Sequence, residues 1–297
     1  MRQLLRITTT FALALGRSAG LALGQQHNAS VTQQNLGNTA MIDQTNTGGA
    51  TNDASVMQIS RAQSATNGNT VQLLKQYGFG NEFDIFQDGR NNLVTSIGDQ
   101  GGQKNATVSP SYNGDMDFYQ YGSNNEIFDF DQAGWNNQAT VRQGQEGSRV
   151  SGNYVDIEAQ YSKKKGTEPS NEILIEQFGN HNRVGQRDGK SGVYQKGANS
   201  LDITQNGDGN LVGKSAIGSA LGFDVSGAKF NLNGAGVAQL GTGNVMDITQ
   251  SGGDVVRQAF QKGHSNSLTV DQNTGLNTAA SYQRGSSNTA TITQGSN

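Results

Sequence analysis

The sequence contains no cysteine, only two prolines and no long apolar run. Without cysteine there are no disulfide bonds and no thiol-ligated metal sites. Apolar residues make up 33% of the 297 residues, whereas ordinary globular domains contain about 45–50%. A thick hydrophobic core is therefore excluded. Val, Ile, Thr, Phe and Tyr nevertheless recur at spaced intervals, which argues against a disordered chain.

Excess positive charge is absent as well. The formal net charge is -3 at pH 7. Binding to nucleic acid or to an anionic membrane surface would require a basic face. We therefore expect no nucleic acid among the partners of this protein and no association with anionic lipid.

The N-terminus has the pattern of an export signal. The basic start MRQLLR is followed by the mostly apolar run ITTTFALALG, and Ala22-Leu23-Gly24 offers a small-x-small cleavage site. We expect residues 1–24 to be a signal peptide, and the mature protein to begin near Gln25 and to be exported and soluble. The apolar run is far shorter than the roughly 20 residues of a membrane span, so we expect none. The alternative is a disordered or weakly helical N-terminus.

Two short phrases alternate along the chain and form its strongest internal signal. The phrase Gln-x-Gly-x-x-Asn begins at Gln76, Gln87, Gln100, Gln120, Gln132, Gln177, Gln205, Gln239, Gln261 and Gln283. The phrase Asn-x-apolar-x-apolar-x-Gln, with looser residues in some copies, begins at Asn38, Asn52, Asn81, Asn137, Asn171, Asn199, Asn244, Asn266, Asn277 and Asn288. Near the C-terminus each phrase recurs every 22 residues, and the two series are offset by 11.

The second phrase predicts a β-strand with two unlike faces. In residues 266–272, Leu268 and Val270 share the parity of the flanking amides and point inward, whereas the residues between them point to water. Strand, corner, strand, corner within 22 residues predicts the fold class: an all-β solenoid of stacked two-strand coils, whose two parallel sheets face each other across a thin core. The mature length divided by this period gives about twelve coils. A hairpin meander is the competing arrangement, but it would require Asn-Gly or Asp-Gly turns of two residues.

Inward-facing amides need partners, because a buried amide without one costs about 1–3 kcal/mol. In a stack, each amide can bond to the same residue of the coils above and below, as in cross-β ladders. We predict that structural ladders used in self-assembly are formed by Asn244, Gln250, Gln261, Asn266, Gln272, Asn277, Gln283, Asn288 and Gln294.

Glycine at the corners fits a backbone that needs a positive φ or a close approach to another chain segment. These corner glycines are Gly78, Gly89, Gly122, Gly134, Gly179, Gly207, Gly241, Gly263 and Gly285. Two stretches break the pattern within the predicted solenoid, which covers residues 25–297. Residues 161–170, YSKKKGTEPS, enlarge one corner, and residues 213–236 are rich in Gly, Ser and Ala and lack clear phrases. We interpret the second stretch as one degenerate coil or a surface excursion.

The paired phrases resemble the curlin repeat, Ser-x-x-x-x-x-Gln-x-Gly-x-x-Asn-x-Ala-x-x-x-Gln. The segment QAGWNNQATVRQ at 132–143 matches its second part, and so does QRGSSNTATITQ at 283–294. The matching positions are Asn137, Ala139, Gln143, Asn288, Ala290 and Gln294. Curlins are secreted subunits of curli, the functional amyloid fibres of bacterial biofilms. The resemblance implies export through the periplasm, passage through an outer-membrane secretion pore, and assembly into a fibre on a nucleator subunit at the cell surface.

No convergent set of side chains indicates an enzyme, a cofactor site or a metal site. The three histidines stand in unlike contexts, and the carboxylates near Asp84 and Asp129 are expected to keep the strand edges soluble. Two further function classes stay open. The first is a monomeric extracellular adhesin or carbohydrate-binding module. The second is an ice-binding face, for which residues 289–293 supply threonines that other coils do not repeat.

Overall fold

A computed structural model describes residues 9–10, 27–46, 51–62, 64–78, 81–100, 115–130, 132–133, 137–157, 159–161, 171–185, 193–213, 237–273 and 275–295. Most of the predicted signal peptide lies outside these residues. So do Gly134, residues 162–170 of the first irregular stretch and residues 214–236 of the second.

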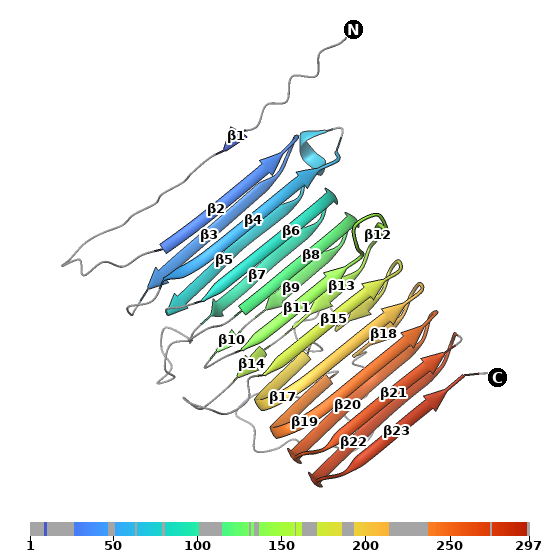
Figure 1. The fold of residues 1–297 in the computed structure, drawn as a ribbon. Helices are drawn as coiled ribbons and strands as arrows, with labels where there is room; N and C mark the ends of the chain where they lie inside the picture. Colours follow the sequence, from blue (N-terminus) through green and yellow to red (C-terminus); the bar gives the residue numbers. More distant parts are fainter. Residues whose placement is uncertain are drawn as a thin grey trace.

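The described chain is all-β, as predicted, and its strands stack in two rows (Figure 1). The front row contains β2 (His27–Gln34), β4 (Asn52–Ser60), β6 (Glu82–Arg90), β8 (Asp115–Ser123), β11 (Gln138–Gln143), β15 (Glu172–Phe178), β21 (Ser267–Asn273) and β23 (Thr289–Gln294). The strands β17 (Val193–Asn206) and β19 (Val237–Ser251) turn a corner, so that their second halves continue the front row between β15 and β21.

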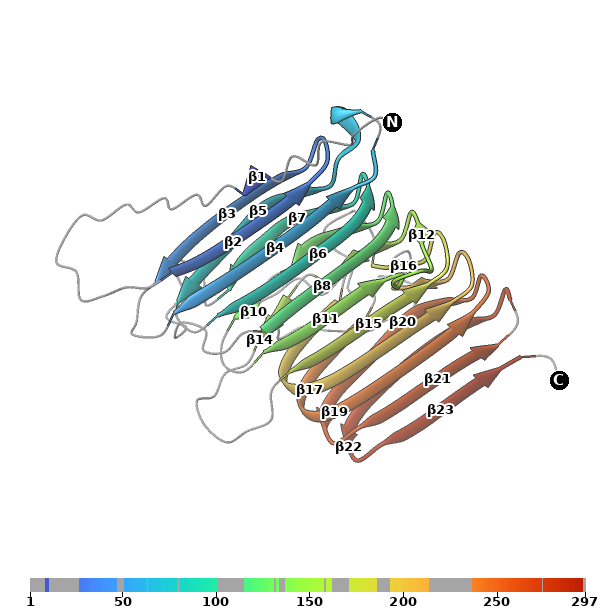
Figure 2. The same ribbon diagram turned by 45° about the horizontal axis from the view of Figure 1, so that its top comes forward.

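The back row contains β3 (Thr39–Asn46), β5 (Thr70–Gly78), β7 (Leu93–Gln100), β9 (Glu126–Phe130), β10 (Gln132–Ala133), β13 (Tyr154–Asp156), β14 (Ala159–Tyr161), β16 (Arg183–Val184), β18 (Leu211–Val212), β20 (Val255–His264) and β22 (Thr278–Ser286). The first halves of β17 and β19 belong to this row as well. Figure 2 shows the stack running from β2 and β3 at one end to β22 and β23 at the other. β12 (Val150–Ser151) pairs in parallel with the end of β8. Outside the rows lie β1 (Thr9–Thr10) and a 3-10 turn, η1 (Ala65–Asn67).

Neighbouring coils pair in parallel throughout the described rows, with like residues in register. In β19 and β21, for example, Gln250 stands beside Gln272 and Ile248 beside Val270. Parallel stacking of this kind follows from a chain that winds in one direction, because each strand meets its counterpart one turn later. The exception at the first coil is β1, which pairs antiparallel with β2 through Thr9 and Thr10.

A thin core lies between the two rows, as the alternation of apolar residues predicts. β6 alternates buried and outward residues along its length, and Phe83 and Ile85 are 0% and 2% exposed. Phe118 of the front row meets Phe130 of the back row with ring centroids 5.3 Å apart. Each front-row strand from β4 to β21 therefore contributes two buried apolar side chains, and amides occupy the flanking positions.

The length of a coil varies along the stack. Front-row glutamines that stand in register are separated by 22 residues only from Gln250 to Gln294. The intervals from Gln33 to Gln250 are 25, 29, 33, 23, 34, 28 and 45 residues. The predicted 22-residue period thus describes the C-terminal rungs, and the number of coils, which was derived from a uniform period, stays a prediction.

Candidate functional site: amide ladders and the two ends of the stack

One continuous ladder of glutamines ends the front-row strands. The side-chain Nε2 of each glutamine donates to Oε1 of the glutamine in the next coil, over distances of 2.7–3.0 Å. The ladder contains Gln33, Gln58, Gln87, Gln120, Gln143, Gln177, Gln205, Gln250, Gln272 and Gln294. Because the interior members from Gln58 to Gln272 are fully buried, these bonds form away from water.

The same glutamines also close each coil. From Gln58 onward, the Nε2 group makes a second hydrogen bond of 3.1–3.5 Å to a backbone carbonyl at the start of a back-row strand. Gln143, for instance, donates to the carbonyl of Glu126 at 3.1 Å. Both hydrogens of the amide are thereby used, one along the stack and one across it. The buried amide is satisfied only because the next coil carries the same residue.

A second glutamine ladder ends the back-row strands. Gln195, Gln239, Gln261 and Gln283 are joined by Nε2–Oε1 bonds of 2.7–2.9 Å. Gln261 and Gln283 also donate to the carbonyls of Val245 and Ser267, where the preceding front-row strand begins. The two ladders therefore use the same geometry at opposite corners of the coil.

Asparagines form two further ladders at the starts of the strands. Along each of them, Oδ1 of one asparagine accepts the backbone N–H of the asparagine in the next coil at 2.9–3.3 Å. At several rungs the side-chain Nδ2 of the next asparagine donates to the same Oδ1, as Asn266 does to Asn244 at 2.9 Å. These amides thus satisfy backbone groups that the corner would otherwise leave unpaired.

The nine predicted ladder residues all stand in one of these four ladders. Gln250, Gln272 and Gln294 belong to the front glutamine ladder, and Gln261 and Gln283 to the back one. The remaining four are asparagines. Asn244, Asn266 and Asn288 begin front-row strands, and Asn277 begins a back-row strand.

Several of the predicted corner glycines that the structure describes lie where two backbones approach closely. Positive φ values are found at Gly89, Gly122, Gly207, Gly241, Gly263 and Gly285. A Cβ on Gly263 would lie 1.8 Å from the carbonyl oxygen of Gly285, and one on Gly179 would lie 1.9 Å from that of Gly207. Both distances are shorter than any real contact, so only glycine fits. Gly78 is described as the last residue of β5, and Gly134 lies outside the described residues.

Sequence reasoning missed one recurrent corner position, the residue directly before the ladder asparagine. It is left-handed at Asn91, Asn124, His181, Ser265, Leu276 and Ser287, and glycine holds a positive φ there at Gly152, Gly209 and Gly243. The frequent Gly or Asn at this position was a readable signal, since these residues tolerate a positive φ. Leu276 lacks that tolerance and is 90% exposed.

A second residue missed was Asp254, which replaces an asparagine in the back-row ladder. Its backbone N–H donates to Oδ1 of Asn210, and its own Oδ1 accepts both the N–H and Nδ2 of Asn277 at 3.0 Å. The carboxylate is fully buried. Aspartate fits because the rung needs an acceptor toward the next coil, and the other carboxylate oxygen accepts the N–H of Ser251.

The two ends of the stack are less covered than its interior. In β23 the inward side chains Ala290 and Ile292 are only partly buried, whereas Leu268 and Val270 in the preceding coil are 0% and 1% exposed. At the other end Val31 and Ile42 are likewise only partly buried. Among the described strands, β22 pairs only with β20 and β23 only with β21. Both ends therefore present apolar surface, and the C-terminal end also presents the edges of β22 and β23.

The ends also differ in hydrogen-bonding polarity. All front-ladder bonds run in one direction, from Nε2 of one glutamine to Oε1 of the glutamine further along the chain. At the last rung, Gln294 donates to the carbonyl of Thr278 at 3.1 Å. An amide nitrogen has two hydrogens, so its second donor points along the stack. One end thus offers ladder donors, and the other offers the ladder acceptor of Gln33.

No group of three or more His, Asp or Glu side chains that could hold a metal ion occurs among the residues that the structure describes. Within that part of the chain, no helix is both long enough and apolar enough to cross a membrane.

Part of the chain matches a known protein family. Residues 263–295 match the family model of the curlin-associated repeat. No curated protein and no solved structure matches the chain. The matched residues contain Asn266, Gln272, Asn277, Gln283 and Gln294, so each of the four ladders is represented in the matched repeat. The resemblance read from the sequence is thereby confirmed over residues 263–295, which carry a curlin-type repeat.

Proposed function

We propose that this curlin-type protein is a structural subunit of an extracellular functional amyloid fibre that contributes to biofilm matrix and cell adhesion. The match of residues 263–295 to the curlin-associated repeat supports this role. So does the ladder architecture, in which identical residues stack in register at strand spacing, as they do in cross-β fibres.

The single observation that carries the proposal is the complementarity of the two ends. The C-terminal end presents the ladder donor of Gln294, and the N-terminal end presents the ladder acceptor of Gln33. A second subunit can therefore stack end to end in the same orientation and continue the ladder. Such a head-to-tail contact does not close on itself and generates a filament.

Burial at the junction adds to the driving force. Docking would cover Ala290 and Ile292 of one subunit with Val31 and Ile42 of the next, all of which are partly exposed in the isolated chain. Full burial of an aliphatic side chain contributes about 1.5–3 kcal/mol. Unpaired strand edges of this kind recruit further chains unless charge or a cap blocks them.

We further propose that the chain is secreted by way of the periplasm and an outer-membrane pore, and that it assembles at the cell surface on a nucleator subunit. In the full-length chain, Thr9 and Thr10 lie within the predicted signal peptide and pair with β2, the edge to which another subunit would add. Removal of residues 1–24 would uncover that edge. Assembly would then start only after export.

Seeding tests templated growth. The purified chain lacking residues 1–24 should form thioflavin-binding fibres after a lag, and fragments of preformed fibre should remove the lag. A species that remains monomeric on a sizing column at all concentrations would instead favour the monomeric adhesin or carbohydrate-binding module.

Substitution of Gly285 tests end-on growth separately from folding of the monomer. A Cβ on Gly285 would meet no backbone atom closely, and its nearest neighbour is Nδ2 of Asn288 at 3.3 Å. In a fibre the next coil would bring a carbonyl to this site, as Gly285 does to Gly263. Gly285 has a φ of 121°, so Gly285→Ala should cost the monomer some stability without a backbone clash. It should slow elongation at least about tenfold, because overpacking at the junction costs about 1–3 kcal/mol.

Gly147→Ala is the matched control. Gly147 also has a positive φ, and a Cβ there would have no neighbour within 4 Å. It lies in a corner on the flank of the stack rather than at an end. Equal elongation rates for Gly285→Ala and Gly147→Ala would contradict growth at this end.

A further inference from the structure

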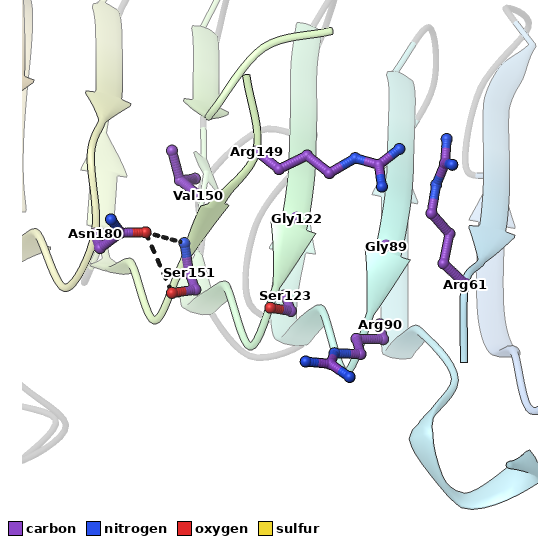
Figure 3. A pocket seen from close by; sticks show the side chains of 9 residues that line it. All are labelled: Arg61, Gly89, Arg90, Gly122, Ser123, Arg149, Val150, Ser151 and Asn180. Atoms are coloured by element: carbon purple, nitrogen blue, oxygen red, sulfur yellow. Dashed lines mark hydrogen bonds between the residues drawn. The ribbon is translucent and has the colours of Figure 1, made fainter. Parts of the chain in front are cut away.

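One flank of the stack carries a groove lined by three arginines (Figure 3). Its volume is about 330 Å³. The floor is formed by the corners at Gly89 and Gly122, where the absence of side chains keeps the surface low. In Figure 3 Arg61 and Arg149 lie on one side of this floor, and Arg90 lies on the other.

The groove exists because four successive corners differ in length. The corners after Gln87 and Gln120 are tight, each reaching the next ladder asparagine in five residues. The corners on either side are longer. Residues 58–69 include the turn η1 and carry Arg61, and residues 143–153 include β12 and a short antiparallel bridge between Gln145 and Ser148. Two long corners thus form walls around two short ones.

The groove has an excess of positive charge. Asp88 forms ion pairs with Arg61 at 2.5 Å and with Arg149 at 3.5 Å. The hydrogen bond from the Arg61 guanidinium lowers the pKa of the Asp88 carboxyl, which keeps it ionised. Arg90 takes part in none of the ion pairs found among the described residues. Three guanidinium groups therefore line the groove, and Asp88 forms ion pairs with two of them.

An aromatic surface borders this charge. Tyr121 stands beside Asp88 in the adjacent strand, and its ring lies 5.3 Å from that of Phe86, centroid to centroid. Both side chains are half-buried on the outer face of the front row. A flat, partly exposed ring next to polar groups is suited to contact the apolar face of a sugar.

We propose that this groove binds the carboxylate groups of an acidic polysaccharide. Guanidinium groups hold carboxylates with two parallel hydrogen bonds, and Arg90 and Arg149 have donors to offer. Nucleic acid is the less suitable polyanion, because its phosphates need an extended basic surface. The outer face beyond the groove instead carries Asp84 and Asp117 in adjacent strands.

The site is independent of fibre growth. Its residues lie in corners on the flank, whereas end-on addition uses β2, β3, β22 and β23 at the ends of the stack. The groove is therefore present in a monomer and repeats along a fibre. Repetition would multiply weak contacts into strong retention of a polysaccharide chain.

The test is binding of an alginate oligosaccharide to the full mature chain, measured by calorimetry at low and at physiological salt. Arg90→Gln and Arg149→Gln should each weaken binding about tenfold, since a charge-assisted hydrogen bond is lost. Asp88→Asn should strengthen it. Arg183→Gln is the matched control, because Arg183 is exposed at the start of β16 and does not line the groove.

Three results would overturn the proposal. The first is unchanged binding in the Arg90→Gln, Arg149→Gln double variant. The second is an equal loss with Arg183→Gln, which would indicate non-specific charge attraction. The third is tighter binding of single-stranded DNA than of alginate with the same dependence on Arg90 and Arg149, which would assign the groove to phosphate groups. A neutral glucan of equal length should not bind, and fibre formation by the variants should be unaffected.

Discussion

The coils of residues 237–294 and those of residues 115–213 keep the same ladders in different surroundings. In the C-terminal region the rungs are 22 residues apart, and β19 and β20 are 15 and 10 residues long. In the middle region the intervals are 23, 34 and 28 residues, and β13, β16 and β18 have only two or three residues. The glutamine bonds nevertheless measure 2.7–3.0 Å in both regions. The amides therefore fix the register of the stack, while the length of the coil is free to vary.

The two regions also differ on their outer faces. The middle region has the ion pair Arg142–Glu176 at 2.7 Å, and the Arg142 guanidinium also lies over the ring of Tyr119. In the last coil the outward residues of β23 are threonines at 289, 291 and 293. Charge on an exposed strand hinders the addition of other chains, and its absence permits it. The difference between β23 and the middle strands is consistent with our proposal that further subunits dock at the end of the stack.

The largest effect is expected from substituting a corner glycine in either region. A Cβ on Gly122 would lie 2.0 Å from the carbonyl oxygen of Val150, and one on Gly263 would lie 1.8 Å from that of Gly285. Both glycines also have positive φ values. Gly122→Ala and Gly263→Ala should each lower the free energy of unfolding by about 3 kcal/mol or more, measured by denaturant titration. A much smaller loss of stability for Gly122→Ala than for Gly263→Ala would show that the backbone of the irregular coils can shift to accommodate a Cβ and that of the regular coils cannot.

A somewhat smaller effect is expected from removing one ladder amide. Gln143 and Gln250 are both fully buried, and each accepts from one glutamine and donates to another. Alanine at either position leaves a donor and an acceptor unsatisfied, which should cost about 2–3 kcal/mol. The controls are the outward-facing residues Thr140→Ala and Thr249→Ala, which should stay within about 0.5 kcal/mol. Unequal costs for the two glutamines would mean that coil length does influence the ladder.

The sequence predicted the ladders well because their residues recur with fixed neighbours. Alternation of apolar residues was enough to identify the strands, and Gln-x-Gly-x-x-Asn was enough to identify the corners. In the C-terminal region the constant interval also gave the register. In that region the repeat spacing alone shows which residues of successive coils pair.

The register of the middle could not be read in this way. Gln143 pairs with Gln177 across 34 residues, and Gln205 pairs with Gln250 across 45. Because the enlarged corners differ in length, the spacing of the glutamines along the sequence does not reveal which of them pair. Asp254 was missed for a related reason. A carboxylate can replace an asparagine in the ladder because the neighbouring rung needs only a hydrogen-bond acceptor, and that need is visible only in the structure. The arginine groove depends on the same long corners and was equally hidden.

A moderate effect is expected at the left-handed corner position. Leu276 adopts a φ of 69°, and the equivalent corner in the middle region uses Asn124 at 55°. A left-handed conformation costs about 1–2 kcal/mol for most residues but little for Gly, and Asn adopts it more readily. Leu276→Gly should therefore stabilise the chain by about 1 kcal/mol, whereas Asn124→Gly should be nearly neutral. Thermal unfolding of the two variants measures the difference, and a loss of stability in Leu276→Gly would reveal a packing role for the exposed leucine.

The smallest effect is expected where the two regions meet. Asp202 of β17 stands beside Asp247 of β19, and the pKa of Asp202 is raised by burial and then by the Asp247 charge. A raised folded-state pKa means that stability is fully present below the ordinary value of 3.8 and is lost as the pH rises through the raised pKa. Asp202→Asn should therefore increase the free energy of unfolding at neutral pH, by less than about 1 kcal/mol for a partly exposed group, and should change nothing near pH 3. Asp271→Asn removes the same charge beside Thr249 and Thr293 and should have less effect at neutral pH. If Asp202→Asn proved equally stabilising at both pH values, repulsion between the Asp202 and Asp247 carboxylates would not be the cause of the stabilisation. Solvent screening, rather than protonation of Asp202, would then explain how the two charges coexist.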